Sequence, residues 1–181
     1  SGCPPSLSIN TRSSKIDNNC QLSNEFALKE IERIKPSIVI MAQSNYHEEV
    51  NWEEIAVELK EKGVKEIVVF GPVPQYKPSL PSVYVRKAWE LNTEYIKTGL
   101  DTKILDTNNL MNDKYKKSNL LHYVSPINDF CNNEGCKVVL NKENRDLMLV
   151  DYGHLSPKGS LIIGDFLFNE LYKRNFFNDF N

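Results

Sequence analysis

Apolar side chains recur along this chain in two alternating patterns, continuous runs and stripes at helical spacing. The runs at residues 37–42 and 66–70 are rich in Val and Ile, which is typical of strands buried on both faces of a sheet. The stripes predict helices at residues 24–35, 52–62 and 84–97, and a final helix that begins at Ser156 and Pro157. Strands that alternate with amphipathic helices predict a three-layer α/β/α sandwich with a mostly parallel sheet.

The rest of the chain shows weaker patterns. Short apolar stretches predict further strands at residues 103–105, 120–124 and 137–140. Polar composition predicts irregular chain at residues 1–22 and 108–119, and the Pro-rich residues 72–81 predict a loop. In a parallel sheet the functional site lies beyond the carboxyl ends of the strands, which here means residues 42–46, residues 71–81 and the segment before the last helix.

Composition narrows the function further. With 181 residues and 40% hydrophobic side chains, the chain is long enough for a single domain, residues 1–181, with its own core. A formal charge of −2 without any basic run argues against a nucleic-acid partner. No apolar stretch approaches the roughly 20 residues that a membrane-spanning helix needs.

Four cysteines fall into two sequence-local pairs, Cys3 with Cys20 and Cys131 with Cys136. Two local disulfides need the least reorganisation of the chain, and they would imply an oxidising compartment. Four free thiols and a zinc site are the alternatives. The gaps of sixteen and four residues fit a structural zinc site poorly, because such sites use closely spaced cysteines.

The strongest chemical candidates stand just before the final helix. Asp151 precedes His154 by three residues in a turn that contains Gly153, and a carboxylate can orient a histidine that acts as a base. A turn-capping Asp and a surface His are the alternative interpretation. Asn45 follows the first predicted strand, where its amide can donate to a developing oxyanion or simply form a turn.

Other candidates have less support. His47 and His122 lack a carboxylate at a matching spacing, and Ser44 lacks the Gly-x-Ser-x-Gly pattern of a nucleophile elbow. Tyr76 and Tyr84 flank the Pro-rich loop, where their rings could stack on a sugar.

Two of these segments resemble the conserved blocks of the SGNH hydrolases. Residues 42–45, Ala-Gln-Ser-Asn, are similar to the third block, normally Gly-x-Asn, and residues 151–156 are similar to the fifth block, Asp-x-x-His. Four further features resemble one subgroup of this family more closely. They are the opening Gly-Cys-Pro-Pro, Pro36, residues 70–74 and the Cys131/Cys136 pair. The members of this subgroup are SGNH domains fused behind membrane acyltransferase-family domains that O-acetylate bacterial surface glycans.

The resemblance implies a flavodoxin-like SGNH fold and a Ser-His-Asp mechanism without a metal or organic cofactor. In it, His154 is the base, Asp151 orients it, and Asn45 stabilises the oxyanion together with backbone N–H groups. Gly2 matches the second-block glycine that supplies one such N–H. The nucleophilic Gly-Asp-Ser block is absent from these 181 residues, and Gln43 and Tyr46 replace the usual Gly and Asp. We therefore expect a domain that is N-terminally incomplete, lacks its first strand, and has its nucleophile on an upstream segment.

The same resemblance implies partners and a location. We expect a glycan acceptor, an acyl donor and an upstream membrane acyltransferase domain that tethers the chain at the periplasmic face of the cell envelope. An exposed sheet edge can favour association with another strand. The alternative functions are a free-standing SGNH carbohydrate esterase and a non-catalytic glycan-binding module. The resemblance also places both predicted disulfides in an oxidising compartment.

Overall fold

The structure, a computed structural model, describes residue 5, residues 18–90 and residues 93–177. The larger helices are α1 (Asn18–Ile34), α2 (Trp52–Glu61), α4 (Thr102–Tyr115) and α6 (Pro157–Lys173), and the shorter ones are the 3₁₀ helix η1 (His47–Glu49), α3 (Leu80–Val83), the π-helical turn η2 (Tyr84–Ala88) and α5 (Pro126–Phe130). The strands are β1 (Ile38–Ala42), β2 (Glu66–Phe70), β3 (Tyr95–Ile96), β4 (His122–Val124), β5 (Cys131–Asn132), β6 (Gly135–Lys137), β7 (Val139–Asn141) and β8 (Asp146–Leu147).

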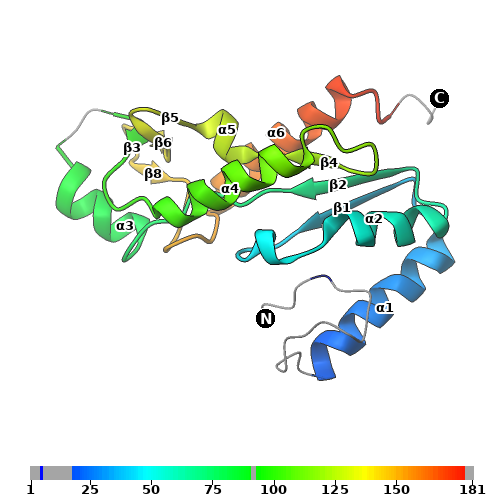
Figure 1. The fold of residues 1–181 in the computed structure, drawn as a ribbon. Coiled ribbons are helices and arrows are strands. Elements are labelled where there is room, and N and C mark those ends of the chain that lie inside the picture. The colour runs from blue at the N-terminus through cyan, green and yellow to red at the C-terminus, as the bar shows by residue number, and fades with distance from the viewer. Residues whose placement is uncertain (1–4, 6–17, 91–92, 178–181) are drawn as a thin grey trace.

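A parallel sheet in the order β1-β2-β4 forms the centre of the molecule. Strand β2 alternates between two cores, as buried parallel strands do. Ile67 and Val69 pack with residues of α2 and α4, whereas Val68 and Phe70 pack with residues of α6. Figure 1 shows α2 and α6 on opposite sides of the sheet. The three-layer α/β/α arrangement is therefore confirmed.

Strand β1 is less buried than the sequence predicts. Val39 and Met41 pack against the core that contains α2, but Ile40, which points to the opposite face, is 45% exposed. Among the described residues β1 lies at the edge of the sheet, and none of them buries Ile40. An apolar run thus predicts the strand correctly but cannot show whether an element covers each face.

The predicted helix at residues 84–97 is wrong in its second half. The helical segment begins earlier, at Leu80, because the Ser79 side chain accepts from the Ser82 N–H and caps it. It ends in the π-helical turn η2, and β3 follows, pairing antiparallel with β6.

The predicted strand at residues 103–105 is also wrong, and so is most of the predicted irregular chain at residues 108–119, because α4 contains residues 103–105 and extends to Tyr115. Asp101 starts this helix by accepting from the Lys103 N–H at 3.2 Å. Every third or fourth residue then faces the core, and these buried residues are Ile104, Asn108, Met111 and Tyr115.

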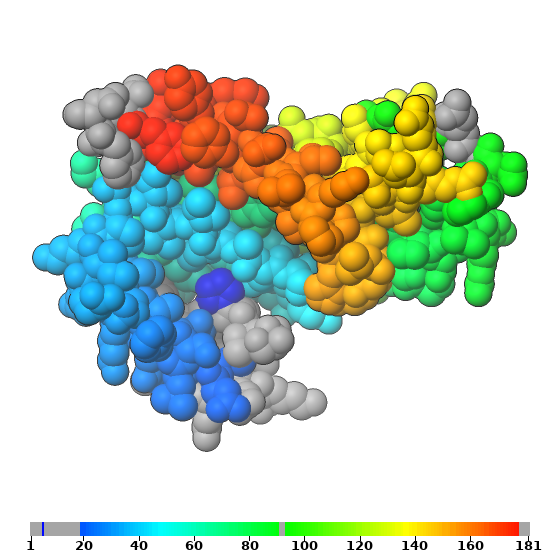
Figure 2. Space-filling model, turned by 180° about the vertical axis from the view of Figure 1, so that it is seen from behind, coloured from blue at the N-terminus to red at the C-terminus, as the bar shows by residue number. Residues whose placement is uncertain are grey.

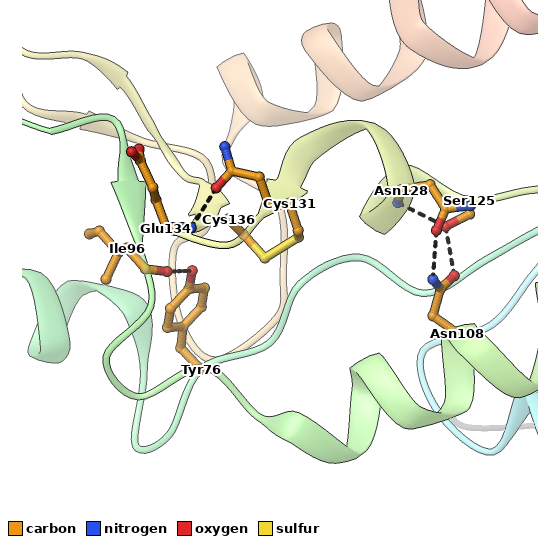
Figure 3. Close-up of a disulfide and its surroundings, with 9 residues drawn as sticks. Tyr76, Ile96, Asn108, Ser125, Asn128, Cys131, Glu134 and Cys136 are labelled. Atoms are coloured by element: carbon orange, nitrogen blue, oxygen red, sulfur yellow. Dashed lines mark hydrogen bonds between the residues drawn. A yellow bond between two sulfur atoms is a disulfide. The ribbon is translucent and has the colours of Figure 1, made fainter.

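Asn108 is a polar residue at a buried position of α4, so it interrupts the apolar stripe by which the sequence would predict this helix. Its Oδ1 accepts from the Tyr123 hydroxyl at 3.0 Å. Figure 3 shows its two other bonds, in which Oδ1 accepts from the Ser125 hydroxyl at 2.6 Å and Nδ2 donates to Asn128. These bonds satisfy a polar group that burial would otherwise penalise.

Smaller differences concern element ends. Helix α1 begins at Asn18, so Ser23 lies inside it rather than capping it. The predicted strand at residues 137–140 is divided between β6 and β7. The helix α2 and the start of α6 agree with the sequence, and Ser156 caps α6 by accepting from the Gly159 N–H. None of the described helices is both long and apolar enough to cross a membrane.

The disulfide between Cys131 and Cys136 is confirmed and joins β5 to β6. Figure 3 shows it beside Tyr76, whose hydroxyl donates to the Ile96 carbonyl at 2.6 Å. Cys20 is also disulfide-bonded, and its predicted partner Cys3 lies outside the described residues.

Candidate active site

Asp151 and His154 occupy the segment between β8 and α6. The segment closes on itself, because the Val150 N–H donates to the His154 carbonyl at 2.9 Å and Leu149 pairs with Leu155. One oxygen of Asp151, Oδ1, accepts from the backbone N–H groups of Gly153 at 2.9 Å and His154 at 2.8 Å. The other, Oδ2, lies 2.6 Å from Nδ1 of the His154 ring.

These contacts keep Asp151 ionised. The Gly153 N–H, followed by the N–H and then the ring of His154, lowers the pKa of Asp151 from its ordinary 3.8 to about 2. An ionised carboxylate beside Nδ1 holds the proton on that nitrogen and stabilises the imidazolium when it forms. The turn interpretation and the catalytic interpretation of Asp151 are therefore compatible, because different oxygens serve each.

The far side of the His154 ring is open. Its side chain is 68% exposed, and among the described residues none forms a hydrogen bond with Nε2. The ring of Tyr152 meets that of His154 edge-on at 5.4 Å between centroids. Nε2 is thus accessible to a substrate or nucleophile from outside the chain described here.

The start of α6 fixes the position of His154. The Ser156 hydroxyl accepts from the Gly159 N–H at 3.0 Å and donates to the Leu147 carbonyl at 2.8 Å. Gly159 rests on the backbone of Met148, where an added Cβ would lie 2.2 Å from the carbonyl oxygen. This packing fixes the N-terminus of α6, which begins at Pro157, three residues after His154.

Asn45 lies in the loop after β1. The side chain of Gln43, which stands where the family usually has Gly, donates to the Asn45 carbonyl at 2.7 Å and fixes the loop. The Asn45 Oδ1 accepts from Gln75 at 3.2 Å, and its Nδ2 donates to the Ser44 hydroxyl at 3.3 Å.

The loop after β2 brings Asn45 and His154 to the same edge of the sheet. Its backbone and the start of α3 hold the Asp151–His154 segment. The Tyr76 N–H of the loop donates to the Tyr152 carbonyl at 2.7 Å, and the N–H of Leu80, the first residue of α3, donates to the Asp151 carbonyl at 3.0 Å. The Gln75 side chain of the loop bonds Asn45 on one side and packs against Gly153 on the other. Figure 2 shows the orange segment near residue 150 against the cyan segment that follows β1.

Gln75 is the residue of this region that the sequence did not single out. It is buried in the Pro-rich loop that the strand-end rule assigns to the site, and that position was the one available signal.

The remaining candidates have structural roles or lie elsewhere. Both Tyr76 and Tyr84 are buried, so the expectation that their rings stack on a sugar is wrong. His122 is half-exposed and pairs with Glu66 at 3.2 Å. Gly2 lies outside the described residues.

His47 is fully buried against Trp52, whose indole N–H donates to the His47 carbonyl at 2.8 Å. Burial lowers the pKa of His47, which keeps the ring neutral within the core. The residues that the structure describes contain no group of three His, Cys, Asp or Glu side chains placed to hold a metal.

Comparisons with known proteins bear on the family and the fold of this chain. A family model described as "SGNH domain (fused to AT3 domains)" matches residues 1–168. Among solved structures, the periplasmic domain of a lipopolysaccharide acetyltransferase from Salmonella ser. Paratyphi A has the same fold, with a TM-score of 0.66 and 24% identity. The match covers 86% of this chain and 62% of that chain, so this chain spans less than two thirds of its structural relative. The curated proteins compared include no similar sequence.

Proposed function

The chain belongs to the family of SGNH domains fused to AT3 domains, and on that premise we propose that it supplies the acid–base part of an O-acetyltransferase site. The acceptor is a bacterial cell-envelope polysaccharide or lipopolysaccharide. The observation that carries the proposal is the 2.6 Å contact between Asp151 Oδ2 and His154 Nδ1, with the opposite ring nitrogen open. That is the arrangement that activates a hydroxyl nucleophile.

The proposed reaction proceeds in two steps, acetylation of the serine and transfer to the sugar. A serine hydroxyl transfers its proton to His154 Nε2 as its oxygen bonds to the acetyl carbonyl carbon of the donor. The tetrahedral intermediate collapses, the donor's leaving group takes the proton from His154, and an acetyl-serine remains. A sugar hydroxyl then loses its proton to His154, attacks the acetyl group and releases the serine, which regains that proton. The charge of Asp151 stabilises the imidazolium in both steps.

The oxyanion of each tetrahedral intermediate needs donors. The Nδ2 group of Asn45 lies at the same sheet edge as His154 and donates within the described residues to the Ser44 hydroxyl alone, at 3.3 Å. In the proposed site Asn45 therefore donates to the oxyanion. One such donor contributes about 3 kcal/mol to transition-state stabilisation.

The nucleophile is assigned to sequence outside these residues. No Gly-Asp-Ser occurs in the 181-residue sequence, and the structural relative is a longer chain. In the proposal this domain lies in the periplasm, joined to a membrane AT3 domain that delivers the acyl group. The relative's description as a periplasmic domain and the family's fusion to AT3 domains support this arrangement.

An esterase that uses water in place of the sugar hydroxyl is the second candidate. The 68% exposure of the His154 side chain favours it, because water reaches the ring freely among the described residues. Both reactions use the same residues, so the acceptor decides between them.

The acetylation of the cell surface tests the proposal. We expect cells that carry His154→Ala in the full-length protein to lose the O-acetyl signal from purified envelope polysaccharide in ¹H NMR spectra. Cells that carry His122→Ala, a change of the same kind at the histidine paired with Glu66, should keep it. O-acetylation that is unchanged in His154→Ala cells would contradict the proposal, and added O-acetyl groups in those cells would favour the esterase.

A further inference from the structure

Gln75 connects the two parts of the proposed site, and neither the family resemblance nor the acid–base pair accounts for it. Its side chain is buried, with 7% of the residue exposed. Its Nε2 donates to two oxygens of the loop after β1, the Ser44 carbonyl at 2.9 Å and Asn45 Oδ1 at 3.2 Å. Its stem touches the other part of the site, because a Cβ added at Gly153 would lie 3.1 Å from Gln75 Cγ.

We propose that Gln75 is a positioning residue that determines which end of the Asn45 amide faces the reacting acyl group. The inference rests on the proposed function, since it assigns a role to Asn45 as an oxyanion donor. Gln75 itself does not touch the substrate in this account. It acts through Asn45.

Three polar groups in a row, the Ser44 carbonyl, the Gln75 amide and the Asn45 amide, fix one another's orientation. The Ser44 carbonyl can only accept, so Gln75 must present its NH₂ group to it. The same NH₂ group faces Asn45, so Asn45 must present its oxygen. The Nδ2 of Asn45 is then directed away from Gln75, and its one bond among the described residues is the 3.3 Å contact with the Ser44 hydroxyl.

This polarity matters because an amide can rotate by half a turn with little change of shape. In one orientation Asn45 offers an N–H group to the oxyanion, and in the other it offers an oxygen that repels it. The Ser44 carbonyl cannot change from acceptor to donor, so it fixes the orientation of the Gln75 amide. The NH₂ group of Gln75 then excludes the second orientation of Asn45. The contact with Gly153 keeps the donor at a fixed distance from the loop that carries His154.

The substitution Gln75→Glu tests the inference in the full-length protein. It keeps the shape but presents acceptors only, so Asn45 must turn its NH₂ group inward. We expect kcat for p-nitrophenyl acetate to fall about 100-fold, with KM changed less than about threefold, which is the effect of losing one oxyanion donor. Gln75→Met, which leaves Asn45 free to rotate, should lose less, about tenfold.

A double-mutant cycle distinguishes positioning from general support of the fold. Asn45→Ala alone should cost about 100-fold in kcat, and Gln75→Glu added to it should cost no more than about twofold further. Gln21→Glu makes the same chemical change on α1, at a glutamine whose Nε2 donates to Glu25 in an exposed hydrogen bond of 3.0 Å, and should leave turnover unchanged. Melting temperatures of all variants are measured alongside, and Gln75→Met, which adds no charge, serves as the second variant if Gln75→Glu does not fold.

Four results would overturn the inference, and three of them leave the oxyanion role of Asn45 in place. The losses in kcat caused by Gln75→Glu and Asn45→Ala could multiply in the double variant. Gln75→Met could lose more turnover than Gln75→Glu. Gln21→Glu could lose as much turnover as one of the two Gln75 variants. Full turnover in Asn45→Ala would overturn both the oxyanion role and the inference. In that case a loss of turnover in His154→Ala would still support the proposed acid–base pair, so the two can fail separately.

Discussion

The carboxylate of Asp151 forms the turn with one oxygen and holds the His154 ring with the other. Because the three contacts all favour the charged form, they lower the pKa of Asp151 to about 2. The charge that the proposed mechanism needs is therefore fixed by local backbone geometry. Asp-x-x-His spacing in the sequence predicted this contact, since a turn of that length returns the ring to the carboxylate.

The lowered pKa of Asp151 predicts a pH-dependent contribution to stability. A carboxyl whose folded pKa lies below its unfolded value stabilises the fold above the unfolded value and loses that contribution as pH falls through the folded value. The window here runs from about pH 4 to about pH 2. We expect Asp151→Asn to lower the free energy of unfolding in urea at pH 7 and at pH 5, with a difference that shrinks steadily below pH 4.

The carboxylate of Asp113, exposed on α4 and paired with Lys116 at 2.7 Å, provides a control. Asp113→Asn should change stability little at any pH, because exposed pairs contribute little. A difference for Asp151→Asn that stays constant between pH 5 and pH 3 would contradict the assigned pKa.

His47 predicts acid sensitivity of a different origin. Burial is the main cause that lowers its pKa, while the backbone of Phe70 and the carboxylate of Glu48 act in the opposite direction. The unfolded chain takes up a proton near pH 6.5 and the folded chain resists it, so the free energy of unfolding must fall as pH drops below about 6.5. In His47→Leu this part of the slope between pH 7.5 and pH 5.5 should disappear from urea denaturation curves, and an unchanged slope would exclude His47 as its source.

At the scale of elements, apolar runs and end signals located β1, β2, α2 and the start of α6 from the sequence. They failed at α4, where the buried Asn108 interrupts the apolar stripe and is stabilised by bonds to Tyr123 and Ser125 that no local pattern reveals. They also failed after η2, where antiparallel pairing with β6 decides the conformation of β3. Long-range contacts override local propensity in both cases.

Two glycines of α6 provide a matched pair that tests the packing of this helix. Alanine normally stabilises a helix relative to glycine by up to about 1 kcal/mol, and Gly164 has nothing within 4 Å of an added Cβ. Gly164→Ala should therefore raise the melting temperature. Gly159→Ala should lower the free energy of unfolding by about 1–3 kcal/mol, because its Cβ would meet the Met148 backbone. Stabilisation by both substitutions in thermal denaturation would contradict the close contact between Gly159 and Met148.

At the scale of the whole molecule, three loops far apart in the sequence meet at one edge of the sheet. The strand-end rule predicted which segments meet, and residue chemistry singled out Asn45, Asp151 and His154 within them. The resemblance then assigned these three residues the roles to be tested. The rule could not predict Gln75, because its importance depends on two acceptors thirty residues away and on the close approach of Gly153. The Cys131–Cys136 pair was predictable because the two residues are near in sequence, as a hairpin requires.

In the proposed mechanism, His154 is the base of an acyl transfer whose nucleophile lies outside these 181 residues. The most direct test of this mechanism is the hydrolysis of p-nitrophenyl acetate by the full-length protein, compared with its His154→Ala and His122→Ala variants and with the 181-residue chain. We predict that His154→Ala loses at least about 1000-fold in kcat, that His122→Ala stays near the unsubstituted protein, and that the 181-residue chain shows almost no turnover. Turnover in His154→Ala close to that of the unsubstituted protein would contradict the account, as would strong turnover by the 181-residue chain that is lost on substitution of one of its own serines, such as Ser44.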